Sequence, residues 1–481
     1  MDTKKPNELS ITEAARALRA KEFTVRELWD ACAAAAQERN GELNAYLELF
    51  AADDAAIDAA QKRIDAEAAG GEKAPALCGI PLAMKDNILI DGHIASAASR
   101  MLANYVASYD ATVTRKLKEA GALFIGRTNM DEFAMGSSTE HSAYGTSKNP
   151  YDVSRVPGGS SGGSASAASG HLALGALGTD TGGSIRQPAA HTGLVGMKPT
   201  YGAVSRSGLI ALGSSLDQAG PLAKSVADAK AMFETIRGQD PFDATSIPAG
   251  LYPARAASAK LRIGVPHHLI EKGIDDDVRA HFNAVLQKLE SEGHAIVDVS
   301  LPTSSYALPV YYVIMPAEAS ANLARFDGIR YGLAERGESL LADYLKSRTE
   351  GFGPETQRRI LLGTFVLSSG YIDAYYRKAD AARRVLTAEY DAAFESCDVI
   401  AFPTTPSPAF KFGEKSDPVS MYLEDIFTVT ANLTGMPAIS VPMGMVERDG
   451  VSLPTGIHFT APKGADDILF TAGAAVTGES L

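Results

Sequence analysis

Short apolar runs that alternate with helical stretches constrain this 481-residue chain more than any other feature of its sequence. Runs of this kind begin at Gly79 and are typical of strands that are covered on both faces. Covered strands separated by helical segments predict the α/β class, with a mixed, largely parallel central β-sheet flanked by helices on both faces. The runs expected to form strands are residues 121–126, 172–177, 262–265, 399–402 and 438–441.

Helices are expected before, between and after these runs. Capping-box spacing at residues 10–13 and 24–27 predicts two helix starts, and an alanine-rich third helix should run from about Ala51 to Gly70. Further helices are expected at residues 112–120, 278–290 and 374–394. We expect one domain over residues 1–481, made of N-terminal helices (1–70), a catalytic core (79–230), a mainly helical cover (about 241–395) and returning strands (396–481).

Composition excludes several classes of protein. The formal net charge is −13 and no block of Lys or Arg stands out, so the chain is not expected to bind a nucleic-acid backbone by itself. Cys32, Cys78 and Cys397 are too few and too scattered for a disulfide framework or a zinc site, and are expected to be reduced, buried thiols. No segment approaches the roughly 18 consecutive apolar residues of a membrane span. We therefore expect a cytoplasmic protein without membrane contact.

Two glycine- and serine-rich turns follow closely on one another, and the second occupies residues 178–188. It follows an expected strand and precedes a segment able to open a helix, so Ser184 should lie where unpaired helix N–H groups and the positive end of the helix dipole converge. Gly182 and Gly183 lack Cβ atoms, so backbone amides from Thr181 to Ser184 can approach a developing oxyanion. The pattern predicts an oxyanion hole, and a phosphate-binding or plain tight turn is the alternative.

The first turn contains a sequence match that its context disfavours. Residues 158–162 have the form G-x-S-x-G, which is the nucleophile elbow of α/β-hydrolases. An elbow follows a buried strand, whereas residues 148–157 are polar and contain two prolines. None of the nine histidines belongs to a recognisable motif. A Ser-His-Asp hydrolase is therefore the disfavoured alternative.

Lys85 ends an apolar run, residues 79–84, and is expected at the tip of a strand. A lysine with a pKa of about 10.4 is protonated at neutral pH and cannot act as a base. Lowering that pKa by about 3 units costs roughly 4 kcal/mol, which lies within the range that full desolvation imposes. A buried, neutral Lys85 would draw a proton from Ser184 through Ser160. A solvated lysine at a strand end is the alternative.

Together, Lys85 and the two serine turns resemble the amidase signature family, whose Ser–cis-Ser–Lys triad has serines 24 residues apart, as Ser160 and Ser184 are here. The resemblance implies the amidase signature fold, with Ser184 as nucleophile, Ser160 as the bridging cis-serine and Lys85 as base. Further segments resemble, within that family, the A subunits of amidotransferases that act on Glu-tRNA(Gln) or Asp-tRNA(Asn). These segments are residues 128–140, 198–202, 214–218, 322–328 and 362–371.

The resemblance implies a glutaminase in which Ser184 attacks the side-chain amide of glutamine, ammonia leaves, and water hydrolyses the glutamyl-enzyme. Free glutamine carries an ammonium and a carboxylate, so its site needs an acid and a cation. The resemblance assigns the acid to Asp425 and the cation to Arg358, with Arg359 as the alternative, because a guanidinium binds a carboxylate through two hydrogen bonds. It also implies that the pocket is lined by Met135, Gly136 and one or both of Tyr311 and Tyr312.

Partners follow from the same resemblance. Ammonia would pass through a tunnel to the B subunit, which uses ATP and Mg²⁺ to activate the misacylated glutamate or aspartate on tRNA, while a small C subunit clamps the A and B subunits together. The tRNA would be contacted mainly through the B subunit. The whole assembly would be a glutamine-hydrolysing ligase of protein biosynthesis, and this chain itself would hold no metal or cofactor. Which of the two misacylated tRNAs is the acceptor stays open.

The sequence departs from the A-subunit pattern in three places. Residues 201–208 read Tyr-Gly-Ala-Val-Ser-Arg-Ser-Gly, His458 stands where glutamine is usual, and the tail after Gly473 is short. These changes leave Lys85, Ser160 and Ser184 intact. Two alternatives to the amidotransferase subunit follow, a stand-alone amidase of small amides and a non-catalytic protein of the same fold.

Overall fold

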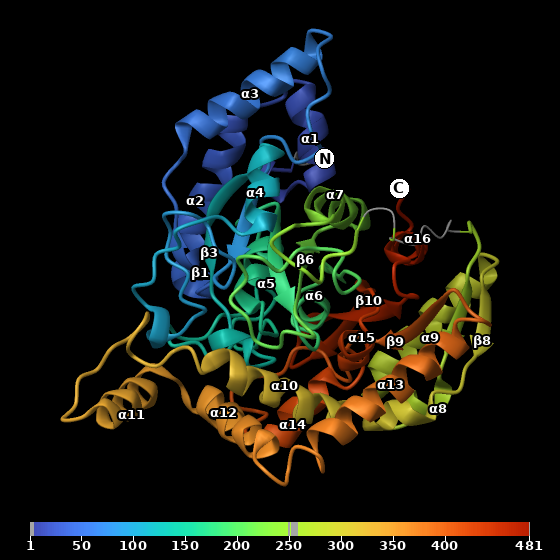
Figure 1. Ribbon diagram of the computed structural model, residues 1–481. Coiled ribbons are helices and arrows are strands. Elements are labelled where there is room, and N and C mark those ends of the chain that lie inside the picture. Colours follow the sequence, from blue (N-terminus) through green and yellow to red (C-terminus); the bar gives the residue numbers. More distant parts are fainter. Residues whose placement is uncertain (1–3, 249–250, 252–257, 481) are drawn as a thin grey trace.

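The computed structural model describes residues 4–248, 251 and 258–480, and its framework is one sheet of eleven strands. The order across the sheet is β1-β3-β2-β4-β6-β5-β10-β11-β9-β7-β8, from the N-terminal helices at one end to α9 at the other (Figure 1). The strands are β1 (Tyr46–Leu49), β2 (Pro81–Lys85), β3 (Leu123–Thr128), β4 (Gly175–Asp180), β5 (Val195–Lys198), β6 (Gln218–Ala223), β7 (Arg262–Val265), β8 (Ala295–Asp298), β9 (Val399–Pro403), β10 (Ala438–Arg448) and β11 (Val451–Thr460).

The mixed sheet is confirmed, but the prediction that it is largely parallel was wrong. Of the ten pairings between described strands, four are parallel, within β3-β2-β4 and within β9-β7-β8, and six are antiparallel. Part of the reason is the hairpin of β10 and β11, whose two-residue turn places Asp449 and Gly450 at φ 55° and 77°. An Asp-Gly turn of this geometry joins antiparallel neighbours.

All five apolar runs supply strands, and two of them are shifted along the chain. The run at residues 121–126 forms β3 at Leu123–Thr128. The run at residues 172–177 enters the sheet only from Gly175, and β4 continues to Asp180. Hydrophobicity marked the wrong start because Leu172 and Leu174 are buried in the preceding turn rather than in the strand. The extension matters because it brings the end of β4 to the second glycine-rich turn.

The expected helices are present, and both capping boxes form. Ser10 and Thr24 accept hydrogen bonds from the third residue of their helices and receive the reciprocal glutamate contact. The helices are α1 (Ile11–Arg19), α2 (Val25–Leu43), α3 (Asp54–Ala68), α4 (Thr112–Glu119), α5 (Gly162–Ser169), α6 (Arg186–His191), α7 (Val226–Ile236), α8 (His267–Ile270), α9 (Asp276–Ser291), α10 (Ala307–Leu323), α11 (Leu340–Gly351), α12 (Pro354–Leu367), α13 (Tyr376–Ala393), α14 (Pro418–Tyr422), α15 (Val429–Thr434) and α16 (Asp466–Thr477). Short 3₁₀ turns are η1 (Pro6–Glu8), η2 (Arg100–Leu102), η3 (Glu132–Ala134), η5 (Pro302–Tyr306) and η6 (Leu423–Asp425).

Helices cover both faces of the sheet centre, and strand β10 shows how. Successive residues of a strand point to opposite faces. Ser440 borders Gly456 on the face where α6 packs, whereas Val441 lies against Gly473 of α16 on the other face. On the face of α6, α5 packs against β2 and β4. The two helices that follow the glycine-rich turns, α5 and α6, therefore lie on the central strands.

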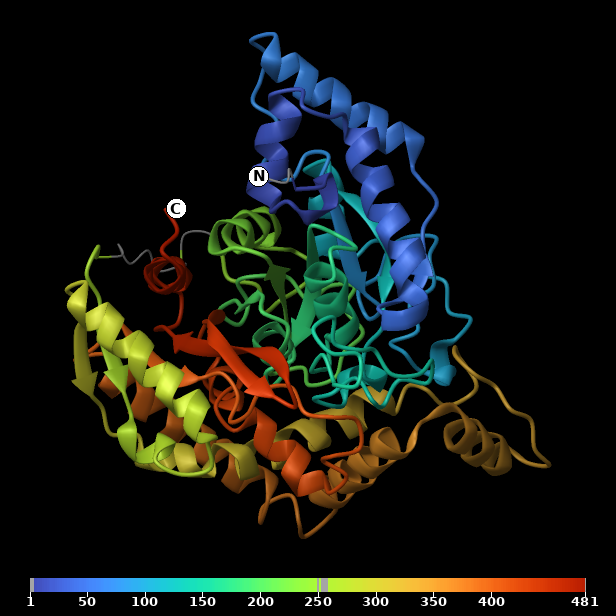
Figure 2. The ribbon, with the colours of Figure 1, turned by 180° about the vertical axis from the view of Figure 1, so that it is seen from behind.

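The region of residues 241–395 is mainly helical, as expected, but it also completes one edge of the sheet through β7 and β8. Helix α10 packs on both α12 and α13, and the three form a second apolar cluster with the loops around Met130 and Leu216. Helix α11 projects from this layer in both views (Figures 1 and 2). The second cluster faces the ends of the central strands, so the seam between the two clusters is where a site can be enclosed.

Within the described ranges, no helix is long and apolar enough to cross a bilayer, and no group of three His, Cys, Asp or Glu side chains is placed to hold a metal ion. Cys32, Cys78 and Cys397 are buried and free. Burial raises the pKa of the Cys32 and Cys397 thiols to about 12, so neither is a reactive thiolate at neutral pH.

Gly363 of α12 allows a close contact between this helix and α10. A Cβ atom at this position would lie 1.9 Å from the carbonyl oxygen of Pro316 in α10. We expect Gly363→Ala to lower the free energy of unfolding by about 1–3 kcal/mol, because the two helices must move apart. Gly41→Ala is the control, since Gly41 lies in α2 with nothing within 4 Å of its added Cβ. Urea unfolding of both variants checks this, and equal effects would contradict the close contact.

Candidate active site

Lys85 is fully buried at the end of β2, between β3 and β4. Its Nζ lies 2.8 Å from Ser160 Oγ and 2.8 Å from Ser161 Oγ, and 3.2 Å from the carbonyl oxygen of Thr179. Lysine has no acceptor when protonated, so an ammonium here would donate to all three groups. The structure thus places Lys85 and Ser160 in direct contact, as the sequence predicts.

Burial changes the acid–base chemistry of Lys85. Desolvation lowers its pKa from 10.5 to about 7, against the opposing influence of three nearby carboxylates, Asp131, Asp180 and Asp217. A large fraction of this amine is therefore neutral at pH 7 and can accept a proton. The alternative, a solvated lysine at a strand end, is excluded by the complete burial of Lys85.

The first serine turn leads into α5, and the peptide bond between Gly159 and Ser160 is cis. The Gly159 amide donates to the side-chain oxygen of Gln187 in α6 at 2.9 Å. A Cβ atom at Gly159 would lie 2.2 Å from a carboxylate oxygen of Asp131, so only glycine permits this approach. The close packing presents the Ser160 hydroxyl to Lys85.

Ser184 lies between the end of β4 and the start of α6 and is 7% exposed. Its carbonyl oxygen accepts a hydrogen bond from the Ser161 amide at 3.2 Å, which ties the two serine turns together. Within the described part of the chain, the Ser160 and Ser184 hydroxyls share no hydrogen bond. The proton path from Ser184 through Ser160 to Lys85 therefore stays a prediction about the substrate-bound enzyme.

The expected oxyanion hole needs one correction. The Gly183 amide donates to the Asp180 carboxylate at 2.9 Å, so it is not available to an oxyanion in this conformation. The Thr181 side chain bonds Asp217 at 2.6 Å. Substitution at Gly182 would place a Cβ 2.7 Å from the Tyr311 hydroxyl. The turn is therefore tightly enclosed, and the amides beside Gly183 are the remaining candidate donors.

Asp425 lies close to this turn from a distant part of the chain. One of its carboxylate oxygens would be 3.4 Å from a Cβ built on Gly183, and the other accepts a hydrogen bond from Ser137 at 2.6 Å. Burial raises the pKa of Asp425 to about 7, while the Ser137 hydrogen bond and the charge of Arg359 act in the opposite direction. An ammonium group bound beside Asp425 would favour its ionised form.

The structure separates the two arginines of α12, against the expectation that Arg358 is the cation of the site. Arg358 is 46% exposed, whereas Arg359 is 4% exposed. The Arg359 guanidinium lies over the rings of Tyr312 and Tyr422, and its Nε bonds Glu355 at 2.7 Å. Consecutive helix residues point about 100° apart, so only one of the pair can face the interior.

The remaining residues expected to line the pocket lie at different places around the site. The Tyr311 hydroxyl lies next to Gly182, while Tyr312 stacks on Tyr422 with ring centroids 3.9 Å apart. Met135 is fully buried in the second apolar cluster. Gly136 packs against Asp131, where a Cβ would lie 2.4 Å from the carboxyl carbon, and so positions the loop that carries Ser137.

Sequence reasoning missed several residues of this site. Ser161 and Gln187 lie within the two glycine-rich turns, and Ser137 lies within residues 128–140, which carry the resemblance. These segments were already singled out, so the three residues could have been recognised as candidates. Glu355 stands four residues before Arg359, which is the spacing of a helix ion pair. Tyr422 had no such signal, because only folding brings α14 next to α12.

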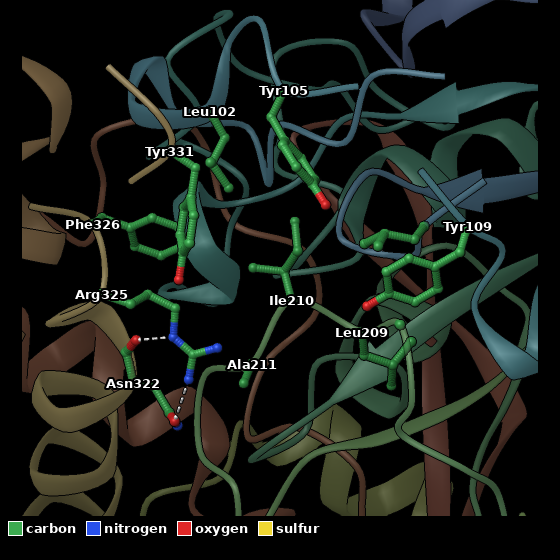
Figure 3. A pocket seen from close by; sticks show the side chains of 12 residues that line it. Leu102, Tyr105, Tyr109, Leu209, Ile210, Ala211, Asn322, Arg325, Phe326 and Tyr331 are labelled. Atoms are coloured by element: carbon green, nitrogen blue, oxygen red, sulfur yellow. Dashed lines mark hydrogen bonds between the residues drawn. The ribbon is translucent and has the colours of Figure 1, made fainter. Parts of the chain in front are cut away.

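A surface pocket of about 250 Å³ lies beside the site, and its lining includes neither Lys85 nor the serine turns, Asp425 or the two arginines of α12 (Figure 3). Tyr105, Tyr109 and Tyr331 line it together with Arg325. Ala211 lines the pocket and directly precedes Leu212 and Gly213, whose backbone amides donate to the Asp217 carboxylate. Asp217 also accepts a hydrogen bond from the Thr181 side chain. The pocket thus adjoins the support of the second turn but is not the place where Ser184 lies.

The lowered pKa of Lys85 predicts a pH-dependent stability difference. Between its folded value of about 7 and its unfolded value of 10.5, the unfolded wild type binds more protons than the folded one, so its free energy of unfolding rises with pH. The slope is about 1.4 kcal/mol per pH unit. The stability of Lys85→Met minus that of wild type should therefore be largest at or below pH 7 and shrink towards pH 10.

Denaturant unfolding at pH 7, 8.5 and 10 checks this difference. Lys62→Met, at an exposed position of α3, controls for loss of one lysine. A difference between Lys85→Met and wild type that does not change over this range would show that Lys85 titrates near its ordinary pKa.

Comparison with known proteins agrees with this geometry. The family described as Amidase matches residues 27–470. The A subunit of glutamyl-tRNA(Gln) amidotransferase from Desulfatibacillum aliphaticivorans is 49% identical over 458 residues, which cover 94% of this chain and 93% of that protein. The crystal structure of the A subunit of glutamyl-tRNA(Gln) amidotransferase from Thermotoga maritima is 39% identical with a TM-score of 0.81 and covers 100% of this chain and 96% of that one. Native peptide amidase from Stenotrophomonas maltophilia is 29% identical with a TM-score of 0.79, covering 98% and 96%. The chain therefore belongs to the amidase family.

Proposed function

We propose that this chain is the glutamine-hydrolysing A subunit of a tRNA-dependent amidotransferase. The observation that carries the proposal is the buried Lys85–Ser160 contact beside the Ser184 turn, with Asp425 and Arg359 at the other side of that turn. The names of the relatives from Desulfatibacillum aliphaticivorans and Thermotoga maritima support the same function. Amidation of tRNA-bound amino acids places such a protein in the cytoplasm.

In the proposed reaction, Ser184 Oγ attacks the side-chain carbonyl carbon of glutamine. Its proton passes through Ser160 to neutral Lys85, which then returns a proton to the departing nitrogen as the C–N bond breaks and ammonia leaves. Backbone amides beside Gly183, whose own amide is held by Asp180, stabilise the tetrahedral oxyanion. Water then adds to the ester by the same proton route, which releases glutamate and restores the Ser184 hydroxyl.

Substrate selection uses the second half of the site. The Asp425 carboxylate pairs with the α-ammonium of glutamine, and Arg359 binds the α-carboxylate while Glu355 and two tyrosine rings hold its guanidinium. Tyr311, beside Gly182, limits the space around the scissile amide. A substrate with both α-groups is bound at two charged points, which fixes the amide against Ser184.

Partner subunits complete the activity in this proposal. The chain carries a formal net charge of −13 and no G-x-x-x-x-G-K-[ST] sequence, so ATP, Mg²⁺ and tRNA are assigned to the B subunit. The C subunit clamps the A and B subunits. Ammonia released at Ser184 then reaches the B subunit through a tunnel instead of the solvent.

The function is tested by measuring ammonia release from glutamine. We expect weak release by the isolated chain and a strong increase after reconstitution with the B and C subunits, ATP, Mg²⁺ and misacylated tRNA. Ser184→Ala in the same complex should release no ammonia, because the nucleophile is lost with little change in volume. Wild-type release by a folded Ser184→Ala variant would overturn the triad. Full turnover of glutamine or a small amide without partners would favour the stand-alone amidase.

The two arginines of α12 provide a matched test of substrate binding. Arg359→Gln should raise the KM for glutamine about tenfold to a hundredfold, since the α-carboxylate loses a charge-assisted hydrogen-bond partner. Arg358→Gln, one residue away on the exposed side of the helix, should change KM less than about threefold. Steady-state kinetics on glutamine and on an amide without α-groups separates the effects. A larger effect of Arg358→Gln would reverse the assignment.

A further inference from the structure

Arg186 is the first residue of α6, two positions after Ser184, and is fully buried. A guanidinium has five N–H donors, and each one here has an acceptor. Nε and Nη2 bond the Asp180 carboxylate at 3.0 and 2.9 Å, and Nη2 also bonds Asn432 at 2.6 Å. Nη1 reaches the Thr428 carbonyl oxygen and the His458 ring, both at 2.9 Å. Loss of any one acceptor leaves a buried charged donor unsatisfied.

Asp180 transmits this arrangement to the second turn. Its two oxygens accept the amides of Gly183 at 2.9 Å and Ile185 at 3.1 Å, which are the residues on either side of Ser184. The same carboxylate is held by Arg186 and by Asn432 at 2.9 Å. The direction of the Ser184 backbone therefore depends on where Arg186 holds Asp180.

His458 supplies the fifth acceptor from β11. Its Nε2 must accept, because a guanidinium only donates, so the ring is neutral and carries its proton on Nδ1. Among described residues, Nδ1 has no hydrogen-bond partner, and the ring is fully buried. Burial, with the charges of Arg186 and Lys198 outweighing that of Asp180, holds the His458 pKa well below its ordinary value. The ring therefore remains an acceptor throughout the neutral pH range.

We propose that His458 is a positioning residue for hydrolysis at Ser184, acting through Arg186 and Asp180 on the two amides that flank the nucleophile. This inference rests on the proposed role of Ser184. His458 touches none of the reacting atoms, and the path has three hydrogen-bonded steps, from His458 to Arg186, to Asp180 and to the turn. Arg186 also holds the Thr428 carbonyl, three residues after Asp425, so the same cation connects the nucleophile turn to the substrate-binding segment.

The test compares three substitutions at His458 in the complete complex. His458→Leu and His458→Asn remove an acceptor within reach of Arg186, whereas His458→Gln keeps a longer side chain whose carbonyl oxygen can accept. His191→Leu is the matched control, because His191 is also fully buried and lies on the same helix as Arg186, with its ring against Phe410. Two measurements are made, amide hydrogen exchange over residues 181–186 without substrate, and kcat and KM for glutamine.

We expect His458→Leu to lower kcat about tenfold to a hundredfold with less than about a threefold change in KM, and to speed exchange of the Gly183 and Ile185 amides about tenfold or more. His458→Gln should recover most of both losses, and His191→Leu should leave exchange over residues 181–186 unchanged. If His458→Leu does not fold, His458→Asn must show the same local changes.

Three results would overturn the inference: wild-type exchange and kcat in a folded His458→Leu or His458→Asn variant, no recovery in His458→Gln, or the same local exchange change in His191→Leu. The exchange measurement is independent of catalysis. A wild-type complex that fails to hydrolyse glutamine would therefore remove the proposed function, whereas unchanged exchange in the variants would remove the positioning role alone.

Discussion

The buried ion pair between Asp180 and Arg186 is the interaction on which the rest of the site depends. Both side chains are fully buried, and their hydrogen bonds join the end of β4, the Ser184 turn, the segment before α15 and strand β11. A buried ion pair contributes little net stability, because desolvation offsets most of the Coulombic gain, but leaving one partner alone costs about 3–5 kcal/mol. Its value here is geometric, since it fixes elements that are far apart in the chain around one serine.

Desolvation also sets the chemistry of the site. Burial lowers the pKa of Lys85 to about 7 and raises those of Asp425 and Asp217 to about 7 and about 6, so three groups with very different ordinary values titrate near neutrality. Lys85 donates hydrogen bonds to hydroxyl and carbonyl oxygens, and the two carboxylates accept them from hydroxyls or backbone amides, which makes the burial tolerable. Groups poised near pH 7 transfer protons with small changes in their surroundings, and such clusters are typical of catalytic sites.

The two halves of the site come from different layers of the fold. Lys85 and the serine turns lie at the ends of central strands, whereas Tyr311, Arg359 and Asp425 come from the helical layer and η6. In the proposed function, the reaction is therefore built on the rigid sheet, and substrate selection on elements that can vary without disturbing it. This division agrees with a family that includes both amidotransferase subunits and a peptide amidase.

The sequence by itself determined the α/β class, the five strands and six helices that it located, and the contact partners Lys85 and Ser160, because glycine-rich turns and apolar runs are local signals. It did not determine the balance of parallel and antiparallel strands, although Asp449-Gly450 marked one hairpin. Only the tertiary structure decided that Arg359 rather than Arg358 faces the interior, that Asp180 occupies the Gly183 amide, and that His458 completes the shell of Arg186. The physical reason is that burial and hydrogen-bond partners depend on how the chain folds in space: Arg359 is covered by Tyr312 and Tyr422, and Arg186 is held by His458, from distant parts of the sequence that no local pattern encodes.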